Sequence, residues 1–146
     1  MKKLITFVIC VCLGVAVTQA RTTTSTNVND LPSAARSLIS TYYGKVGVNH
    51  IKIDHKFIGG NEYDVILNDG TEIEFNSDGQ LTEIDCGSKA VPSKLILPAI
   101  TKYVKANYPS AKIVQMEVER NSYKIELNNG LELKFSRSGK FLKVDD

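Results

Sequence analysis

The stretch YDVILNDGTEIEFNSDGQLTEID, from Tyr63 to Asp85, occurs a second time as YKIELNNGLELKFSRSGKFLKVD, from Tyr123 to Asp145. The two stretches are offset by sixty residues (123 − 63 = 60) and share Tyr, Leu, Asn, Gly, Glu, Phe and Asp at matched positions. Self-similarity at a fixed spacing indicates a duplicated structural unit. The chain is therefore expected to contain two copies of one motif.

Each copy is predicted to form three short strands joined by two tight turns. Asp69-Gly70 and Asn129-Gly130 are dipeptides that accept the positive φ angles of a two-residue type I′ hairpin turn. Between the turns apolar residues alternate with polar ones, which predicts one buried face for every strand. The predicted core face comprises Tyr63, Val65, Leu67, Ile73, Phe75, Tyr123, Ile125, Leu127, Leu131, Leu133 and Phe135.

An amphipathic helix is predicted upstream of each motif, followed by one more strand. Apolar residues in the first copy recur at helical spacing from Ala35 to Tyr42, and Gly44 ends the pattern. The second copy has the same stripe from Ile96 to Val104, but Pro98 lies inside it and predicts a kink or a new helix start. The fold class is thus α+β: two tandem repeats, each a helix plus four antiparallel strands, forming one curved sheet with the helices on one face.

Four segments are expected along the chain. Residues 1–20 are predicted to be a signal peptide, 21–30 a flexible leader, 31–86 the first repeat and 91–146 the second. The signal peptide is indicated by two lysines, an apolar run from Leu4 to Val17 and small residues up to Ala20, after which we expect cleavage. The run is too short for a membrane span, for which about 20 residues are needed. We therefore expect a periplasmic or secreted protein with no stable membrane anchor.

Cleavage would also change the charge and cysteine count. Lys plus Arg falls from 18 to 16 and equals the 16 acidic residues, which gives no support for nucleic-acid binding. Residues 31–85 hold four basic and nine acidic side chains (4 − 9 = −5), and residues 91–146 hold ten and six (10 − 6 = +4). This charge dipole could attract the two halves, join copies head to tail or steer a polar partner. Cys86 alone would remain, either as a buried free thiol or in an intermolecular disulfide.

No catalytic, metal or cofactor site is predicted. His50 and His55 are the only histidines, and their spacing puts them on opposite faces of a strand. The sequence has no Gly-rich phosphate loop and no nucleophile motif. Paired carboxylates at Glu72 and Glu132 are explained by the duplication alone. An enzyme is therefore not expected.

A family resemblance rests on the pattern Tyr-x-[Val/Ile]-x-Leu-Asn-x-Gly-x-Glu-x-x-Phe-x-x-x-Gly, present from Tyr63 to Gly79 and from Tyr123 to Gly139. With its upstream helices, this chain resembles the beta-lactamase-inhibitor-like, PepSY-like family of exported bacterial proteins. The resemblance implies a periplasmic protein of two tandem α+β repeats sharing a continuous antiparallel sheet, similar to the beta-lactamase inhibitor fold. It does not imply inhibition, because fold does not determine function. The chain also lacks the disulfides of the true inhibitors, and no binding residue is carried over.

Function is expected to lie on the sheet face opposite the helices. A broad sheet face can supply the roughly 800 Å² per partner of a specific complex. The first hypothesis is a non-catalytic protein-binding or inhibitor-like module whose partner is another envelope protein. The alternative is a small-ligand-binding or envelope-sensing protein, with an apolar pocket beside Ile66 or between the repeats. The candidate partner-binding residues are Asp64, Ile66, Glu72, Glu74, Lys124, Glu126 and Lys134.

Overall fold

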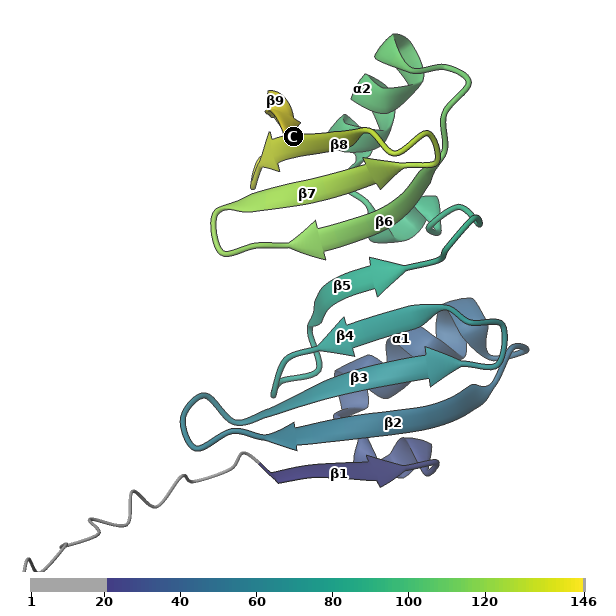
Figure 1. The fold of residues 1–146 in the computed structure, drawn as a ribbon, viewed down its shortest axis with the longest axis vertical. Coiled ribbons are helices and arrows are strands. Elements are labelled where there is room, and N and C mark those ends of the chain that lie inside the picture. The colour runs from purple at the N-terminus through teal and green to yellow at the C-terminus, as the bar shows by residue number, and fades with distance from the viewer. Residues whose placement is uncertain (1–20, 146) are drawn as a thin grey trace, which may run out of the picture.

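A computed structural model describes residues 21–145, which form a nine-stranded antiparallel sheet with its strands in chain order (Figure 1). Two α-helices lie on one face of the sheet and leave the other face uncovered (Figure 1). The fold is therefore α+β. The strands are β1 (Arg21–Ser25), β2 (Val48–His55), β3 (Asn61–Leu67), β4 (Glu72–Phe75), β5 (Leu81–Asp85), β6 (Ile113–Val118), β7 (Ser122–Leu127), β8 (Glu132–Ser136) and β9 (Phe141–Asp145).

Both helices follow the sequence pattern. Helix α1 (Ser33–Tyr43) ends at Gly44, as predicted, and buries Ala35 and Ile39 against the sheet. Helix α2 (Pro98–Asn107) begins at Pro98, so the proline starts a new helix, as it can where no backbone N–H is needed. The residues before it form a separate 3₁₀ turn, η2 (Ser93–Leu95), and a similar turn, η1 (Val28–Asp30), precedes α1.

The buried face of the sheet is the one that alternation predicted. Nine of the eleven predicted core residues are buried, and the other two, Tyr123 and Leu131, are half-buried. Ile84 and Met116 are opposite one another where β5 pairs with β6, so the core continues across the middle of the sheet. One end of the core is aromatic: the Phe135 ring lies 5.4 Å from the Tyr103 ring and 5.7 Å from the Phe141 ring, measured between centroids.

The first turn of each motif differs from the two-residue type I′ turn that was predicted. A type I′ turn needs positive φ at both central residues, but among the described residues only glycines have positive φ. The backbone N–H of Leu67 donates to the Thr71 carbonyl at 2.9 Å, which leaves a three-residue loop whose last residue, Gly70, has φ +84°. A three-residue hairpin loop with a final left-handed glycine fits this geometry.

The second turn of each motif packs against a helix N-terminus. A Cβ atom added to Gly79, which has φ +78°, would lie 2.8 Å from Pro32 Cβ and 2.9 Å from the Ala35 backbone nitrogen. Gly139 approaches Ala99 of α2 in the same way. These glycines therefore allow the β4–β5 and β8–β9 turns to contact the helices closely.

The start of the described chain differs from the flexible leader that was expected. Residues Arg21–Ser25 form strand β1, which pairs with β2 along its whole length. The Thr22 hydroxyl donates to Asp54 at 2.5 Å, and the Thr23 hydroxyl lies 3.1 Å from a ring nitrogen of His55. Threonine favours strands because its β-branched side chain suits a pleated surface. This edge strand was not predicted because its residues are polar and lack apolar alternation.

The predicted signal peptide, residues 1–20, lies outside the described residues. Phe57 continues the parity of the buried Ile51 and Ile53, but it lies beyond the end of β2 and is 91% exposed. Within residues 21–145, no helix combines the length and apolar character that a membrane span requires.

Candidate binding face

The uncovered face carries two rows of side chains that cross the sheet. Because residues directly opposite one another in neighbouring strands share a face, the register places every member of a row beside the next. The first row, from β2 to β9, is Lys52, Asp64, Glu74, Glu83, Glu117, Lys124, Lys134 and Lys143. The second row, from β3 to β9, is Ile66, Glu72, Asp85, Gln115, Glu126, Glu132 and Asp145.

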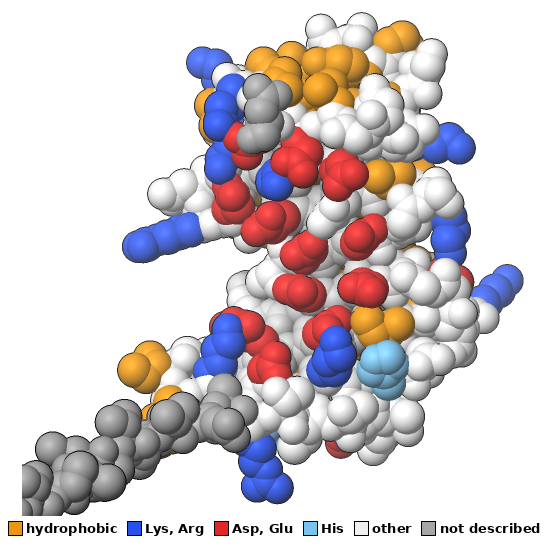
Figure 2. All heavy atoms as spheres, viewed as in Figure 1, with side chains coloured by type: hydrophobic (Ala, Val, Ile, Leu, Met, Phe, Trp, Pro, Cys, Tyr) orange, Lys and Arg blue, Asp and Glu red, His pale blue; other side chains and the backbone are white. Residues whose placement is uncertain are grey.

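All seven sequence-predicted residues lie in these rows, although they do not form one cluster. Asp64 and Glu74 are direct neighbours, whereas Lys124 and Lys134 are separated from them by β5 and β6. Figure 2 looks onto this face and shows acidic side chains along its middle. The middle is acidic because β5 and β6 contribute further carboxylates, which sequence reasoning missed: Glu83, Asp85 and Glu117.

Ion pairs divide the face into a neutralised end and an acidic centre. On β7 and β8, the Lys124 ammonium lies 2.7 Å from Glu132, and the Lys134 ammonium lies 2.7 Å from Glu119 at the end of β6. Among residues 21–145, no salt bridge reaches the carboxylates of β4 and β5 or Glu117 of β6. The amide of Gln115 does donate a hydrogen bond to Glu83 at 2.5 Å. The carboxylates without an ion pair among residues 21–145 therefore lie mainly on β4 to β6, with Glu126 of β7 beside them.

Glu74 is the side chain whose pKa shows the effect of these neighbouring negative charges. Its side chain as a whole is exposed, but its carboxyl group loses water against the neighbouring strands, and this desolvation raises its pKa. The nearby carboxylates of Glu83 and Asp64 raise that pKa further, because a second negative charge is unfavourable beside them. Glu74 is thus a carboxylate that would gain from a positive partner.

A small groove opens beside Glu74 on the same face. It has a volume of about 250 Å³ and is lined by residues of β2 to β5 and the β4–β5 turn. Asp64 receives the Lys52 ammonium on Oδ2 at 3.1 Å, whereas its Oδ1 is buried and has no hydrogen-bond partner within the described chain. A buried carboxylate oxygen without a partner is costly. The lining residues of this acidic groove are Asp54, Glu62, Tyr63, Asp64, Glu74, Phe75, Asn76 and Thr82.

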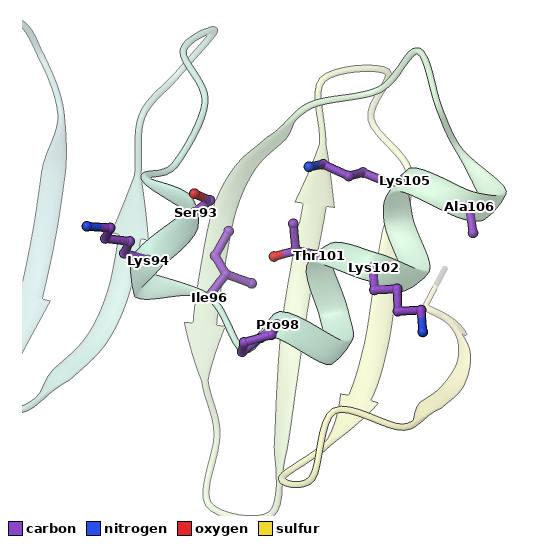
Figure 3. Close-up of a pocket in the computed structure, with 8 residues that line it drawn as sticks. All are labelled: Ser93, Lys94, Ile96, Pro98, Thr101, Lys102, Lys105 and Ala106. Atoms are coloured by element: carbon purple, nitrogen blue, oxygen red, sulfur yellow. The ribbon is translucent and has the colours of Figure 1, made fainter.

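Two other hollows bear on the small-ligand alternative. A groove of about 840 Å³ runs along α2 and η2, and Figure 3 shows Ile96 and Thr101 beside it while Lys94 and Lys102 point in opposite directions. Because these lysines diverge, they do not converge on one anion. A second groove of about 450 Å³ lies between the halves of the sheet, where the Arg137 guanidinium lies 4.8 Å from the centre of the Tyr123 ring.

The remaining reactive side chains have ordinary structural partners. His55 lies 3.0 Å from the Asn61 side-chain oxygen, and the structure groups no three metal-ligating residues within the described chain. Cys86 is a buried free thiol whose sulfur lies 3.5 Å from the Tyr43 hydroxyl. Burial raises the pKa of the Cys86 thiol and of the Tyr43 phenol, so both are held in their neutral forms. A buried neutral thiol is a poor nucleophile.

Comparison with known proteins agrees with this architecture. The family model described as "Putative beta-lactamase-inhibitor-like, PepSY-like" matches residues 61–143, more than half of the chain. The chain belongs to this family. Among curated proteins, none matches this PepSY-like protein.

Three crystal structures from Bacteroides resemble the PepSY-like protein over 86% of its length. A "putative periplasmic protein of unknown function" from Bacteroides vulgatus is 45% identical, with a TM-score of 0.82 over 100% of that chain. A "putative calcium-regulated periplasmic protein" from Bacteroides thetaiotaomicron is 31% identical, with a TM-score of 0.80 over 97% of that chain. A second B. vulgatus protein, described as a "putative periplasmic protein", is 34% identical, with a TM-score of 0.80 over 97% of that chain.

Proposed function

We propose that this PepSY-like protein is a non-catalytic binding module of the bacterial envelope whose uncovered sheet face takes basic side chains of a partner protein. The observation that carries this proposal is the acidic groove, where Asp64 Oδ1 is buried and has no hydrogen-bond partner among residues 21–145. Glu74, beside it, is crowded by other carboxylates. An arginine or lysine entering the groove would satisfy the unpaired oxygen and offset the crowded charge.

The charges along the first row of the uncovered face restrict which charges a partner can present to it. Carboxylates fill the first row from Asp64 to Glu117, and lysines follow it from Lys124 to Lys143. A partner that covers Asp64, Ile66, Glu72, Glu74, Lys124, Glu126 and Lys134 would therefore present basic groups to β3–β6, whereas the lysines of β7–β9 already have carboxylate partners. Charge complementarity of this kind selects the partner and its orientation.

The chemistry of the groove can be tested without knowing the partner. The ¹⁵N-labelled protein from Arg21 onward is titrated with N-acetyl-arginine amide, and backbone amide shifts are followed by NMR. We expect saturable shifts at groove residues such as Asp64, Glu74 and Thr82. N-acetyl-citrulline amide, which has a similar shape without the charge, is the matched control. Equal shifts with the two compounds, or none near the groove, would contradict the proposal.

The partner itself can be sought by affinity capture from an envelope extract. Wild-type protein is compared with Glu74→Lys/Glu83→Lys, which reverses two adjacent charges of the first row. Asp30→Lys/Asp78→Lys carries the same net charge change at exposed positions outside both rows. A protein retained by wild type and by the control, but lost from the row variant, supports the sheet face as the contact surface.

A second candidate is envelope sensing through a divalent cation. The B. thetaiotaomicron relative is described as calcium-regulated, and the acidic groove offers carboxylate oxygens of the type that Ca²⁺ prefers. Because no three metal-ligating side chains of residues 21–145 group together, waters or a partner would have to supply most of the six to eight oxygen ligands that Ca²⁺ takes. A CaCl₂ titration should then shift groove amides, and Asp64→Asn/Glu74→Gln should abolish the response. Equal shifts with NaCl at matched ionic strength would exclude this candidate.

We further infer that the protein is exported by a signal peptide cleaved after Ala20, and that its halves arose by duplication. The duplication is supported by matched cross-strand pairs: Tyr63 faces Phe75, and Tyr123 faces Phe135 sixty residues later. Mass spectrometry of the protein isolated from its native envelope tests the cleavage. A mature N-terminus at Arg21 is expected, and one elsewhere contradicts the predicted site.

A further inference from the structure

The outer edge of β9 has no neighbouring strand among residues 21–145, although the matching strand of the first motif has one. That matching strand is β5, sixty residues earlier (145 − 85 = 60), and its residues 83–85 pair with β6. The corresponding residues of β9 are Lys143, Val144 and Asp145. An edge strand presents unpaired backbone N–H and C=O groups that another strand can bind. The first motif therefore provides a precedent for an antiparallel strand at this edge.

Apolar side chains of β9 are exposed where β5 is covered. Ile84 is 0% exposed, whereas Val144 at the matching position is 40% exposed. Leu142, which stands where β5 has Thr82, is 50% exposed. Figure 2 shows apolar side chains gathered at the end of the molecule that carries β9 and α2 in Figure 1. Exposed apolar surface that is contiguous in this way is typical of an interaction site.

Helix α2 is placed beside β9 much as α1 is placed beside β5. Turn glycines at matching positions, Gly79 and Gly139, each approach the first residues of the adjacent helix closely. Strand β6 pairs with β5 while α1 is in this position. A strand can therefore be expected to fit beside β9 without displacing α2.

We propose that β9 pairs with β9 of a second copy of this chain, antiparallel and about a twofold axis at Val144. Within β9, Val144 is opposite the buried Leu133, so it lies on the helix-covered face. Lys143 and Asp145 lie on the uncovered face, opposite residues of the two charged rows. Because opposite residues of an antiparallel pair share a face, Val144 would contact the partner's Val144, and Lys143 would be opposite the partner's Asp145.

Charge complementarity selects this register and a second copy as the occupant. The contact makes the Lys143–Asp145 pair twice, once on each side of the axis. An axis at Lys143 would instead place two lysines opposite one another, and a shift of one residue would put charged side chains against apolar ones. Lys143 is also ion-paired with Asp145 of its own strand, so the four groups would alternate in charge. Strand β1, at the other edge, is wholly polar and would bury no apolar side chain by pairing with itself.

The proposed contact gives a closed and weak dimer. A twofold contact uses the same surface of both subunits and therefore stops at two copies. Because only a short strand and the apolar side chains beside it take part, the interface is small and its affinity is expected to be low. The acidic groove is lined by residues of β2 to β5, away from this edge, so the inference is independent of the proposed function.

An exchange of charges tests the register. Sedimentation velocity is measured at increasing concentrations of the protein from Arg21 onward, and wild type is expected to pass from monomer to dimer. Lys143→Asp and Asp145→Lys each place like charges opposite one another, which should raise the dimer dissociation constant by about tenfold or more. An equimolar mixture of these two variants restores opposite charges at both places and should form heterodimers as readily as wild type forms dimers.

The mixture also separates a lost contact from a lost fold, because an unfolded variant would not be rescued by the other. Lys45→Asp and Asp78→Lys are the matched controls, since they make the same charge changes at exposed positions away from β9 and should leave dimerisation unchanged. Wild type that stays monomeric at every concentration, or a mixture that associates no better than the single variants, overturns the proposal.

A disulfide at the axis gives a second, geometric test. Residues directly opposite in an antiparallel pair have Cα atoms about 4.5–5.5 Å apart, which is within the range of a disulfide. Mild oxidation should therefore yield a covalent dimer of Val144→Cys but not of Thr24→Cys, an exposed position on β1. Equal cross-linking of the two variants overturns the proposal. Protection of β9 amides only in the presence of a different envelope protein would assign the edge to another chain, and also overturns it.

Discussion

Replacing Glu74 with glutamine should make the protein more stable at neutral pH. Glu74 lies directly opposite Asp64 on one side and Glu83 on the other, and no salt bridge to Glu74 is present within residues 21–145. Its pKa is raised above the ordinary value of 4.5 by desolvation and by these carboxylates. Glutamine keeps the shape and removes the charge, so the repulsion that opposes folding is lost.

The size of the gain follows from the geometry. Like charges directly opposite in an antiparallel pair destabilise by about 0.2–1 kcal/mol each. Lys52 partly neutralises Asp64 by an ion pair at 3.1 Å, and Glu74 is exposed to screening solvent. We therefore expect a gain of roughly 0.5–1 kcal/mol in unfolding free energy at low salt. That gain should fall strongly in 1 M salt, where the Debye length is about 3 Å.

The pH dependence has a definite sign. A carboxyl group whose pKa is raised in the folded state binds its proton more tightly there, so its stabilising contribution is present at low pH. The contribution is lost as the pH rises through the folded pKa. Wild type and Glu74→Gln should thus have equal stability below the ordinary glutamate pKa, and the variant should be more stable at pH 7.

Urea denaturation followed by circular dichroism at several pH values measures this difference. Glu132→Gln is the matched control, because Glu132 lies on the same face but is ion-paired with Lys124 at 2.7 Å. Its loss should leave stability unchanged or slightly reduced. A Glu74→Gln protein that is less stable than wild type at pH 7, or whose gain persists at pH 3, would refute the electrostatic account.

Three further predictions concern the core and the turns. Phe135→Ala and Phe75→Ala should each lower the free energy of unfolding by about 3–5 kcal/mol. The loss for Phe135→Ala should be about 1 kcal/mol larger, because its ring contacts two other aromatic rings. Equal losses in urea denaturation would contradict this. Gly79→Ala should lower the melting temperature more than Gly70→Ala, because both have positive φ but only Gly79 packs against a helix; a larger effect at Gly70 would be inconsistent with that contact. Cys86 should resist Ellman's reagent in the native protein and react on unfolding, and rapid native labelling would mean that the burial is wrong.

The sequence predicted the helix-covered face well because burial imposes a period on it. Alternation from Tyr63 to Phe75 identified buried residues that the register then paired, and of the two outcomes expected at Pro98, a kink or a new start, the structure has the new start. These features depend on local spacing. The two-residue turn at Asp69-Gly70 was wrong because the same dipeptide also ends a three-residue loop, and only closure of the Leu67–Thr71 hydrogen bond distinguishes the two.

The acidic centre could be predicted only in part because it depends on pairing between distant strands. Alternation placed Asp64 and Glu74 on the uncovered face, but Glu83 and Glu117 become neighbours only when β5 pairs with β6 across the linker. Alternation around the buried Ile84 was the available signal for Glu83. Strand β1 was missed for a related reason, since an edge strand with one partner has little need of apolar residues.

The contrast between the two ends of the uncovered face argues for a binding role rather than a merely solvated surface. On β7 and β8 like charges also lie directly opposite one another, but the diagonal Lys124–Glu132 pair and the Lys134–Glu119 pair offset them, as is expected of a sheet face that only meets water. The same fold could accommodate lysines on β4 to β6, since lysines occupy the first row elsewhere. Those strands instead carry adjacent carboxylates, one of which has a raised pKa. Residues that lower stability without contributing to the core are expected where function requires them. If the sheet face binds a basic partner, Glu74→Gln should therefore increase stability and weaken binding in the same protein, and a variant that improved both would locate the partner's contact elsewhere.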